Sequence, residues 1–185
     1  MNKLKAGKTE LKILESCARA TNKSACMNVK EAKEIGDESW SEFEATFVAL
    51  LYHELIESGV DYWRISLENK PNTDNEKHKD KKIDLWVETD EDITYMIEVK
   101  LIIYKEKSEG LRRMNSMAGV RGDLDKLKEI IKNNPSVKGI VIGAYTGKAE
   151  VKLKEIIEKI DEDTKSYLSE NLKLIVSTSK ECKFL

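Results

Sequence analysis

Three ionisable side chains, Asp84, Glu98 and Lys100, fall within one largely apolar stretch of the chain. Residues 95–104 alternate with a period of two, as a β-strand does, and Glu98 and Lys100 share one face. Two buried charges are costly unless they are paired or bind a metal. A polar turn at 88–92 predicts a hairpin that returns this strand against residues 83–87 and places Asp84 beside Glu98. Such a group is typical of a hydrolytic site that binds a divalent metal ion.

The elements that must position these side chains follow from hydrophobic periodicity and from capping residues. We expect one or two helices in 8–34, broken near 21–24, and a helix from about 38 to 58 that stops at Gly59. Strands are expected at 61–67, 83–87, 95–104, 137–144 and 172–177, with helices at 124–131, capped by Asp123, and at 151–168. This order predicts an α/β fold, a mixed β-sheet flanked by helices on both faces. We expect a single domain over 1–185, with a helical appendage at 1–35, a core at 38–145 and a C-terminal helix and strand at 146–185.

An acidic residue on the apolar face of the helix near 38–58 is a further candidate. Glu44 and Glu54 both project into that face. They lie roughly 15 Å apart along a helix axis, so one metal site can use only one of them. The periodicity alone leaves the choice open.

The residues around the central pair resemble a known family. Ile-Asp84-Leu-Trp-Val and, thirteen residues after the aspartate, Ile-Glu98-Val-Lys100 resemble the PD-(D/E)xK nuclease superfamily, with Ile83 in place of the proline. The resemblance covers about residues 38–145. It implies a restriction-endonuclease-like fold, in the order α-β-β-β-α-β with extra N- and C-terminal elements. It also favours Glu44 over Glu54, because the superfamily often keeps a helical acid there.

The resemblance implies a metal-dependent nuclease that hydrolyses DNA phosphodiester bonds. Asp84, Glu98 and the Val99 carbonyl would offer oxygen ligands to Mg²⁺, for which Mn²⁺ would substitute. Lys100 would position or deprotonate the attacking water, and Glu44 would hold a metal-associated water or a second ion. Two alternatives stay open: a non-catalytic nuclease-fold interaction module that binds nucleic acid or protein, and a ribonuclease.

The charge distribution of the chain limits the ways in which it could bind a nucleic acid. Charged residues make up 36% of the chain but the net charge is only −2, so contact with phosphates needs a local patch. Two segments rich in basic residues are candidates: Lys77, Lys79, Lys81 and Lys82, then Lys105, Lys107, Arg112, Arg113 and Arg121. We also expect a homodimer, because cutting both strands of a duplex needs two sites.

The remaining composition indicates the compartment. Three cysteines without a CxxC spacing fit a reduced protein, and no apolar run is long enough to span a membrane. We therefore expect a cytoplasmic protein without membrane contact. With two histidines and no cysteine or histidine at ligand spacing from them, zinc is not expected.

Overall fold

The computed structural model describes residues 3–25, 40–71, 80–107, 110–113, 117–132, 134–147, 157–158, 160, 162–178 and 181–185. The helices are α1 (Lys3–Ala25), α2 (Trp40–Glu57), the 3₁₀ turn η3 (Tyr62–Arg64), α3 (Met117–Ile131) and α5 (Glu162–Ser166). The strands are β1 (Ile65–Asn69), β2 (Ile83–Glu88), β3 (Thr94–Lys107), β4 (Gly110–Arg113), β5 (Val137–Gly147), β6 (Leu172–Ser177) and β7 (Cys182–Phe184). No helix among these residues is both long and apolar enough to cross a bilayer.

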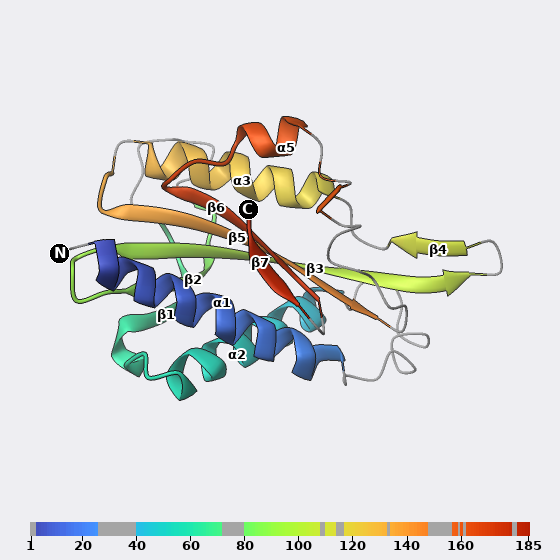
Figure 1. Cartoon of the computed structure of the whole chain (residues 1–185), viewed down its shortest axis with the longest axis horizontal. Helices are drawn as coiled ribbons and strands as arrows, with labels where there is room; N and C mark the ends of the chain where they lie inside the picture. The colour runs from blue at the N-terminus through green and yellow to red at the C-terminus, as the bar shows by residue number, and fades with distance from the viewer. Residues whose placement is uncertain are drawn as a thin grey trace.

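The strands form one mixed sheet in the order β1-β2-β3-β5-β6-β7. β1, β2 and β3 are antiparallel neighbours, whereas β3, β5 and β6 run parallel. β4 pairs only with the far end of β3, and the two strands extend beyond the rest of the sheet (Figure 1). The sheet confirms the mixed α/β architecture expected from the sequence.

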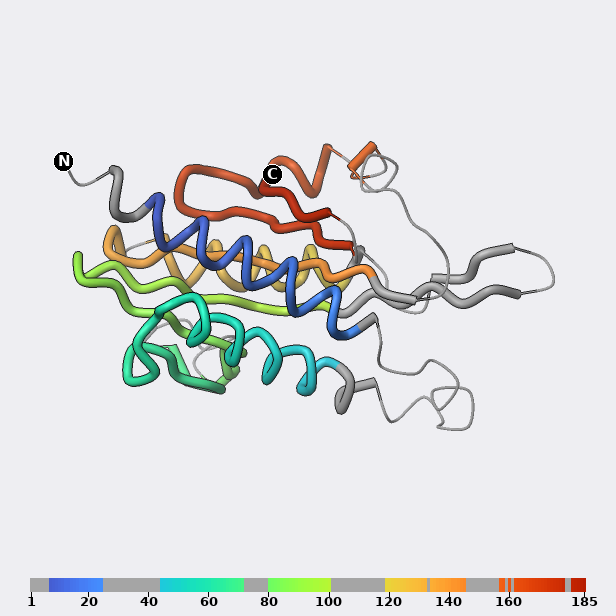
Figure 2. The backbone as a smooth tube through the Cα atoms, turned by 60° about the horizontal axis from the view of Figure 1, so that its bottom comes forward, coloured from blue at the N-terminus to red at the C-terminus, as the bar shows by residue number. Residues whose placement is uncertain are grey.

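Helices cover both faces of the sheet. α1 and α2 lie together against one face, and α3 and α5 lie on the other (Figures 1 and 2). The alternation of β3 explains the two cores, because Tyr95, Ile97 and Val99 join the cluster under α1 and α2. Met96 joins the cluster under α3 instead. Glu98 therefore projects on the α3 side of a strand whose neighbouring residues are buried.

Several expected element boundaries are confirmed. β6 spans residues 172–177 as predicted, and the hairpin of β2 and β3 turns where expected. α2 ends at Glu57, and Gly59, with a φ of +81°, closes it, with hydrogen bonds from Gly59 N to Ile56 O (2.9 Å) and from Val60 N to Leu55 O (3.0 Å). Glycine adopts this left-handed conformation without the steric cost of a Cβ atom.

Other expectations about the N-terminal half are wrong. α1 is not broken at 21–24: the hydroxyls of Thr21 and Ser24 bond to carbonyls one turn earlier, and the helix runs to Ala25. The expected first strand at 61–67 starts later, because residues 62–64 form the 3₁₀ turn η3 and β1 begins at Ile65. The rest of the expected 8–34 helical region lies outside the described residues.

In the C-terminal half one predicted helix start is wrong. α3 begins at Met117, not 124, so Asp123 lies inside the helix and does not cap it. Of the helix expected at 151–168, residues 151–156, 159 and 161 lie outside the described part, residues 157–158 are helical, residue 160 is not, and α5 spans 162–166. Short strands such as β4 and β7 were not anticipated, because three or four residues carry too little periodicity to be recognised.

Candidate active site

β2 and β3 bring Asp84 to the middle of β3. Their residue pairing runs from Glu88 and Thr94 to Leu85 and Ile97. Beyond that pair, the Asp84 side chain connects β2 to β3, because its Oδ2 accepts a hydrogen bond of 2.8 Å from the backbone N–H of Val99. The expected hairpin therefore does place Asp84 at the Glu98–Lys100 segment. The Val99 carbonyl as a metal ligand stays a prediction.

Glu98 is a buried carboxylate, with only 3% of its surface exposed. Burial, reinforced by the negative charge of Asp84, raises its pKa from 4.5 to about 8. An ion pair with Lys126 of α3 works in the opposite direction, and the charge of Asp123 adds to the rise. The Lys126 ammonium is also held by the Lys82 carbonyl at 3.1 Å. The positive charge of Lys126 therefore does not compensate for the burial of Glu98 and the nearby negative charges, which disfavour its ionised form.

Lys100 lies between two acids from different helices. Its Nζ donates to Glu44 Oε1 of α2 at 2.9 Å and lies 3.5 Å from Asp123 Oδ2 of α3. Burial alone would lower the pKa of Lys100, but Asp123 and Glu44 outweigh it and the net pKa is raised. Lys100 consequently stays protonated at neutral pH. A protonated Lys100 fits the expected role of positioning the attacking water, and it does not fit the expected role of a base that deprotonates this water.

The two glutamates of α2 have separate surroundings. Glu44 contacts Lys100, whereas Glu54 pairs with Arg19 and Lys23 of α1. Burial of Glu54 tends to raise its pKa, yet Lys23 and Arg19 reverse the effect and the pKa is lowered. Glu54 therefore joins two helices, and Glu44 is the helical acid that reaches the Asp84–Lys100 cluster.

Asp123 and Lys126 were missed as site residues by the sequence interpretation. They stand three residues apart on α3, beside the buried positions Val120, Leu124 and Leu127. Polar residues on the apolar side of a helix were the signal that identified Glu44. The same signal was available here, but a helix expected to begin at 124 excluded Asp123 from it.

A pocket of about 430 Å³ opens onto the carboxylates of Glu44 and Asp84. Its lining comes from α2, β1 and β2: Glu44, Ala45, Val48, Ala49, Leu67, Glu68 and Asp84. Two acidic side chains of the cluster are therefore reachable by a ligand from the side of α2.

The donor set fits a magnesium ion. Mg²⁺ usually binds one or two carboxylates and keeps several waters or phosphate oxygens as its other ligands. Asp84 and Glu98 offer two carboxylates; burial and the charge of Asp84 together raise the pKa of Glu98, and a cation would relieve the repulsion between the two acids. Within the described residues no three His, Cys, Asp or Glu side chains gather closely enough to enclose an ion with protein ligands alone.

The predicted phosphate-contacting residues are only partly described. Lys81 and Lys82 are exposed just before β2, and Arg121 lies on α3. Lys105 and Arg112 are cross-strand partners in the β3–β4 hairpin, which also carries Lys107 and Arg113. Lys77 and Lys79 lie outside the described residues. The hairpin thus gathers four basic positions on two short, adjacent backbone segments.

Comparisons with known proteins assign no family. No family model and no curated protein matches the chain. Among solved structures, the chain is similar to the structure of Pyrococcus furiosus SfsA in complex with Ca²⁺, with 14% sequence identity and a TM-score of 0.34. The match covers 74% of this chain and 61% of that one. A similarity at this level assigns neither a family nor a function.

Proposed function

We propose that this protein is a metal-dependent nuclease of the restriction-endonuclease-like fold, acting on DNA. The observation that carries the proposal is that Asp84 bonds to the backbone of β3 between Glu98 and Lys100, and that burial and the charge of Asp84 raise the pKa of Glu98 to about 8. The order α2, β1-β2-β3, α3, β5 supports the proposed fold, since it repeats the expected core order.

Mg²⁺ would be held by Asp84 and Glu98, with the Val99 carbonyl as a further ligand. When bound, it supplies positive charge that polarises a phosphate oxygen and makes water more acidic. Lys100 carries a permanent positive charge beside the carboxylates, so it binds a phosphate oxygen or orients the attacking water. Glu44 and Asp123 hold the Lys100 ammonium from two sides and fix its direction.

DNA would be held by backbone contacts with phosphates. The basic hairpin of β3 and β4 and the lysines before β2 are the segments proposed for this contact, and their contribution is independent of sequence and weakened by salt. A homodimer would supply the second site needed to cut a duplex on both strands. Light scattering at micromolar concentration tests that state directly.

One observation favours a second candidate, a non-catalytic module of the same fold. Glu98 forms an ion pair with Lys126 without any metal ion, so the cluster is also consistent with a buried ion-pair network that has no catalytic role. The net charge of −2 is compatible with a protein partner. Such a module would bind its partner equally well with and without a divalent ion.

The test uses the wild type, Lys100→Met and Lys128→Met on linear, circular and branched DNA and on RNA, with Mg²⁺ or Mn²⁺. Lys128 is an exposed lysine of α3 that lies over the Tyr167 ring, so its replacement controls for the loss of one charge. We expect Lys100→Met to lose at least about 100-fold in cleavage rate, and Lys128→Met to cleave as the wild type does. Cleavage of RNA alone would change the substrate to RNA. If no substrate is cut, the interaction module is the correct assignment.

Two glycines of α3 allow a finer test of Lys100. A Cβ atom added to Gly119 would lie 3.3 Å from Lys100 Cδ, whereas one added to Gly122 meets nothing within 4 Å. Both Gly→Ala changes favour the helix by about 0.5–1 kcal/mol. We expect Gly119→Ala to lower cleavage roughly 10-fold because it displaces Lys100. Gly122→Ala should gain stability in urea denaturation and keep full activity; equal activities of the two variants would contradict the placement of Lys100.

A further inference from the structure

The inner face of α1 is fixed to the end of β6 by buried polar contacts. Thr21 Oγ1 lies 2.7 Å from Ser177 Oγ and also donates to the Cys17 carbonyl at 2.8 Å. All three residues are completely enclosed. Helix α1 and strand β6, far apart in the sequence, are therefore in side-chain contact at this level of the sheet.

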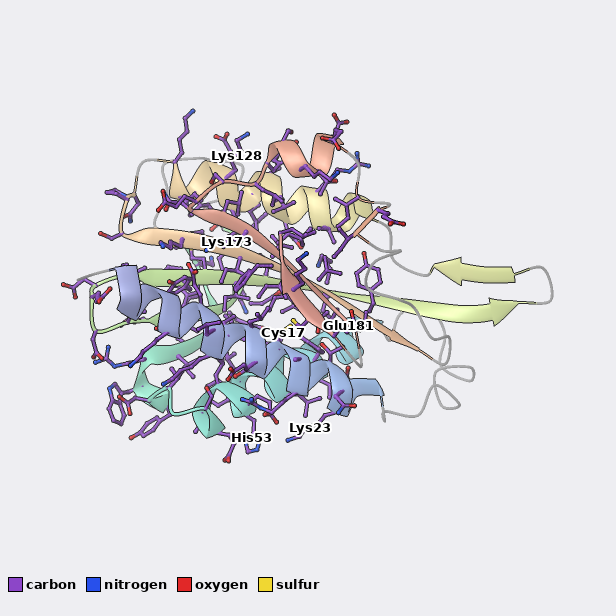
Figure 3. All side chains as sticks on the ribbon, in the orientation of Figure 1. Cys17, Lys23, His53, Lys128, Lys173 and Glu181 are labelled. Carbon is purple, nitrogen blue, oxygen red and sulfur yellow. The ribbon has the colours of Figure 1, made fainter. Side chains whose placement is uncertain are left out.

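The same contact brings two cysteines together. Cys17 lies one turn before Thr21 on the same side of α1, and Cys182 of β7 is the cross-strand partner of Ser177. The Cys17 and Cys182 thiols lie close enough to change each other's pKa, and the Ser177 hydroxyl acts on both. Figure 3 places Cys17 between α1 and the sheet, on the side where β7 lies. The pair is present as two free thiols.

The two thiols differ in reactivity. Burial raises the pKa of Cys17, which has no exposed surface. The hydrogen bond from Cys17 lowers the pKa of Cys182, which is partly exposed. A low-pKa, accessible thiol next to a buried one is the arrangement of an attacking and a resolving cysteine. Cys182 would react first, and Cys17 would react only with Cys182.

We propose that Cys17 and Cys182 form a redox-active dithiol site that closes to a disulfide by exchange with a low-molecular-weight disulfide such as oxidised glutathione. The Cys182 thiolate attacks one sulfur of glutathione disulfide, forms a mixed disulfide and releases one glutathione thiolate. Cys17 then loses its proton and attacks Cys182 Sγ, which expels the second glutathione. Two protein thiols are oxidised, and one glutathione disulfide is reduced to two thiols.

The disulfide would join α1 to the edge strand β7. Because the two cysteines lie near opposite ends of the chain, the bond closes almost its whole length into one loop and restricts the unfolded state strongly. The oxidised protein should therefore have a higher Tm than the reduced one. This site lies in the α1–β7 contact and is independent of the proposed nuclease function.

The experiment uses the full chain carrying Cys26→Ser, which removes the third cysteine, together with versions that add Cys182→Ser or Cys17→Ala. Each protein is incubated with oxidised glutathione at pH 8, and its intact mass and linked peptides are measured. We expect the Cys17–Cys182 disulfide, with loss of two hydrogen atoms, in the Cys26→Ser protein. Its Tm should rise, and dithiothreitol should reverse the change.

The single variants separate the two roles. Without Cys17, the reaction should stop at a glutathione adduct on Cys182; without Cys182, Cys17 should stay unmodified in the folded protein. The proposal is overturned if the Cys26→Ser protein keeps both thiols or ends as a glutathione adduct. That measurement requires no second substitution, so a folding defect in either single variant does not affect the decision.

Discussion

Asp84→Asn is expected to abolish divalent-ion binding and to lower cleavage by roughly 1000-fold. The substitution removes one of two carboxylates that face the proposed ion while it keeps the shape of the side chain. The asparagine Oδ1 can still accept the hydrogen bond from the Val99 N–H, so this contact between β2 and β3 should survive. Calorimetry with Mn²⁺ measures the binding, and a plasmid assay measures the cleavage.

The matched control is Asp90→Asn. Asp90 is an exposed residue in the turn between β2 and β3, where it forms an ion pair with Arg64 of η3. This variant therefore removes the same charge without changing the cluster. We expect it to bind Mn²⁺ and cleave as the wild type does. Undiminished ion binding by Asp84→Asn would show that the ion, if any, is held elsewhere.

The part of the site that lies on two neighbouring strands, β2 and β3, was predictable from the sequence. Asp84 and Glu98 belong to one hairpin, and the alternation of β3 fixes which residues share a face. A local turn and a period of two are sufficient for that inference. The contact between Glu44 and Lys100 required the resemblance as well, because periodicity put Glu44 and Glu54 on the same face.

The features that depend on contacts between elements far apart in the sequence were not predictable in the same way. Glu54 is satisfied by Arg19 and Lys23, two cations of a helix whose packing against α2 cannot be read from local periodicity. The start of α3 was hidden by Gly119 and Gly122, since glycine disfavours helices. Gly119 is explained by the tertiary structure, where the stem of Lys100 packs against it.

The pKa of Glu98 gives the second large expected effect, a loss of stability as pH rises in the metal-free protein. Glu98 has a pKa of about 8 when folded and 4.5 as the reference for the unfolded chain, so between these values the folded state binds the extra proton. Its contribution to stability is therefore fully present below about pH 4.5 and is lost as pH rises through 8. The total loss is on the order of 3–5 kcal/mol. Urea denaturation in EDTA from pH 5 to pH 9 measures it.

Glu98→Gln should remove this pH dependence, because the amide stays neutral throughout the range. The variant should be more stable than the wild type at pH 9 and yet fail to bind Mn²⁺, since the same buried charge that destabilises the metal-free fold would attract the ion. Glu54→Gln is the matched control. Because Arg19 and Lys23 lower the pKa of Glu54, its replacement should instead cost stability at neutral pH. If Glu98→Gln keeps the wild-type slope, Glu98 is ionised and satisfied by Lys126 alone, and the need for a metal ion at this point of the sheet disappears.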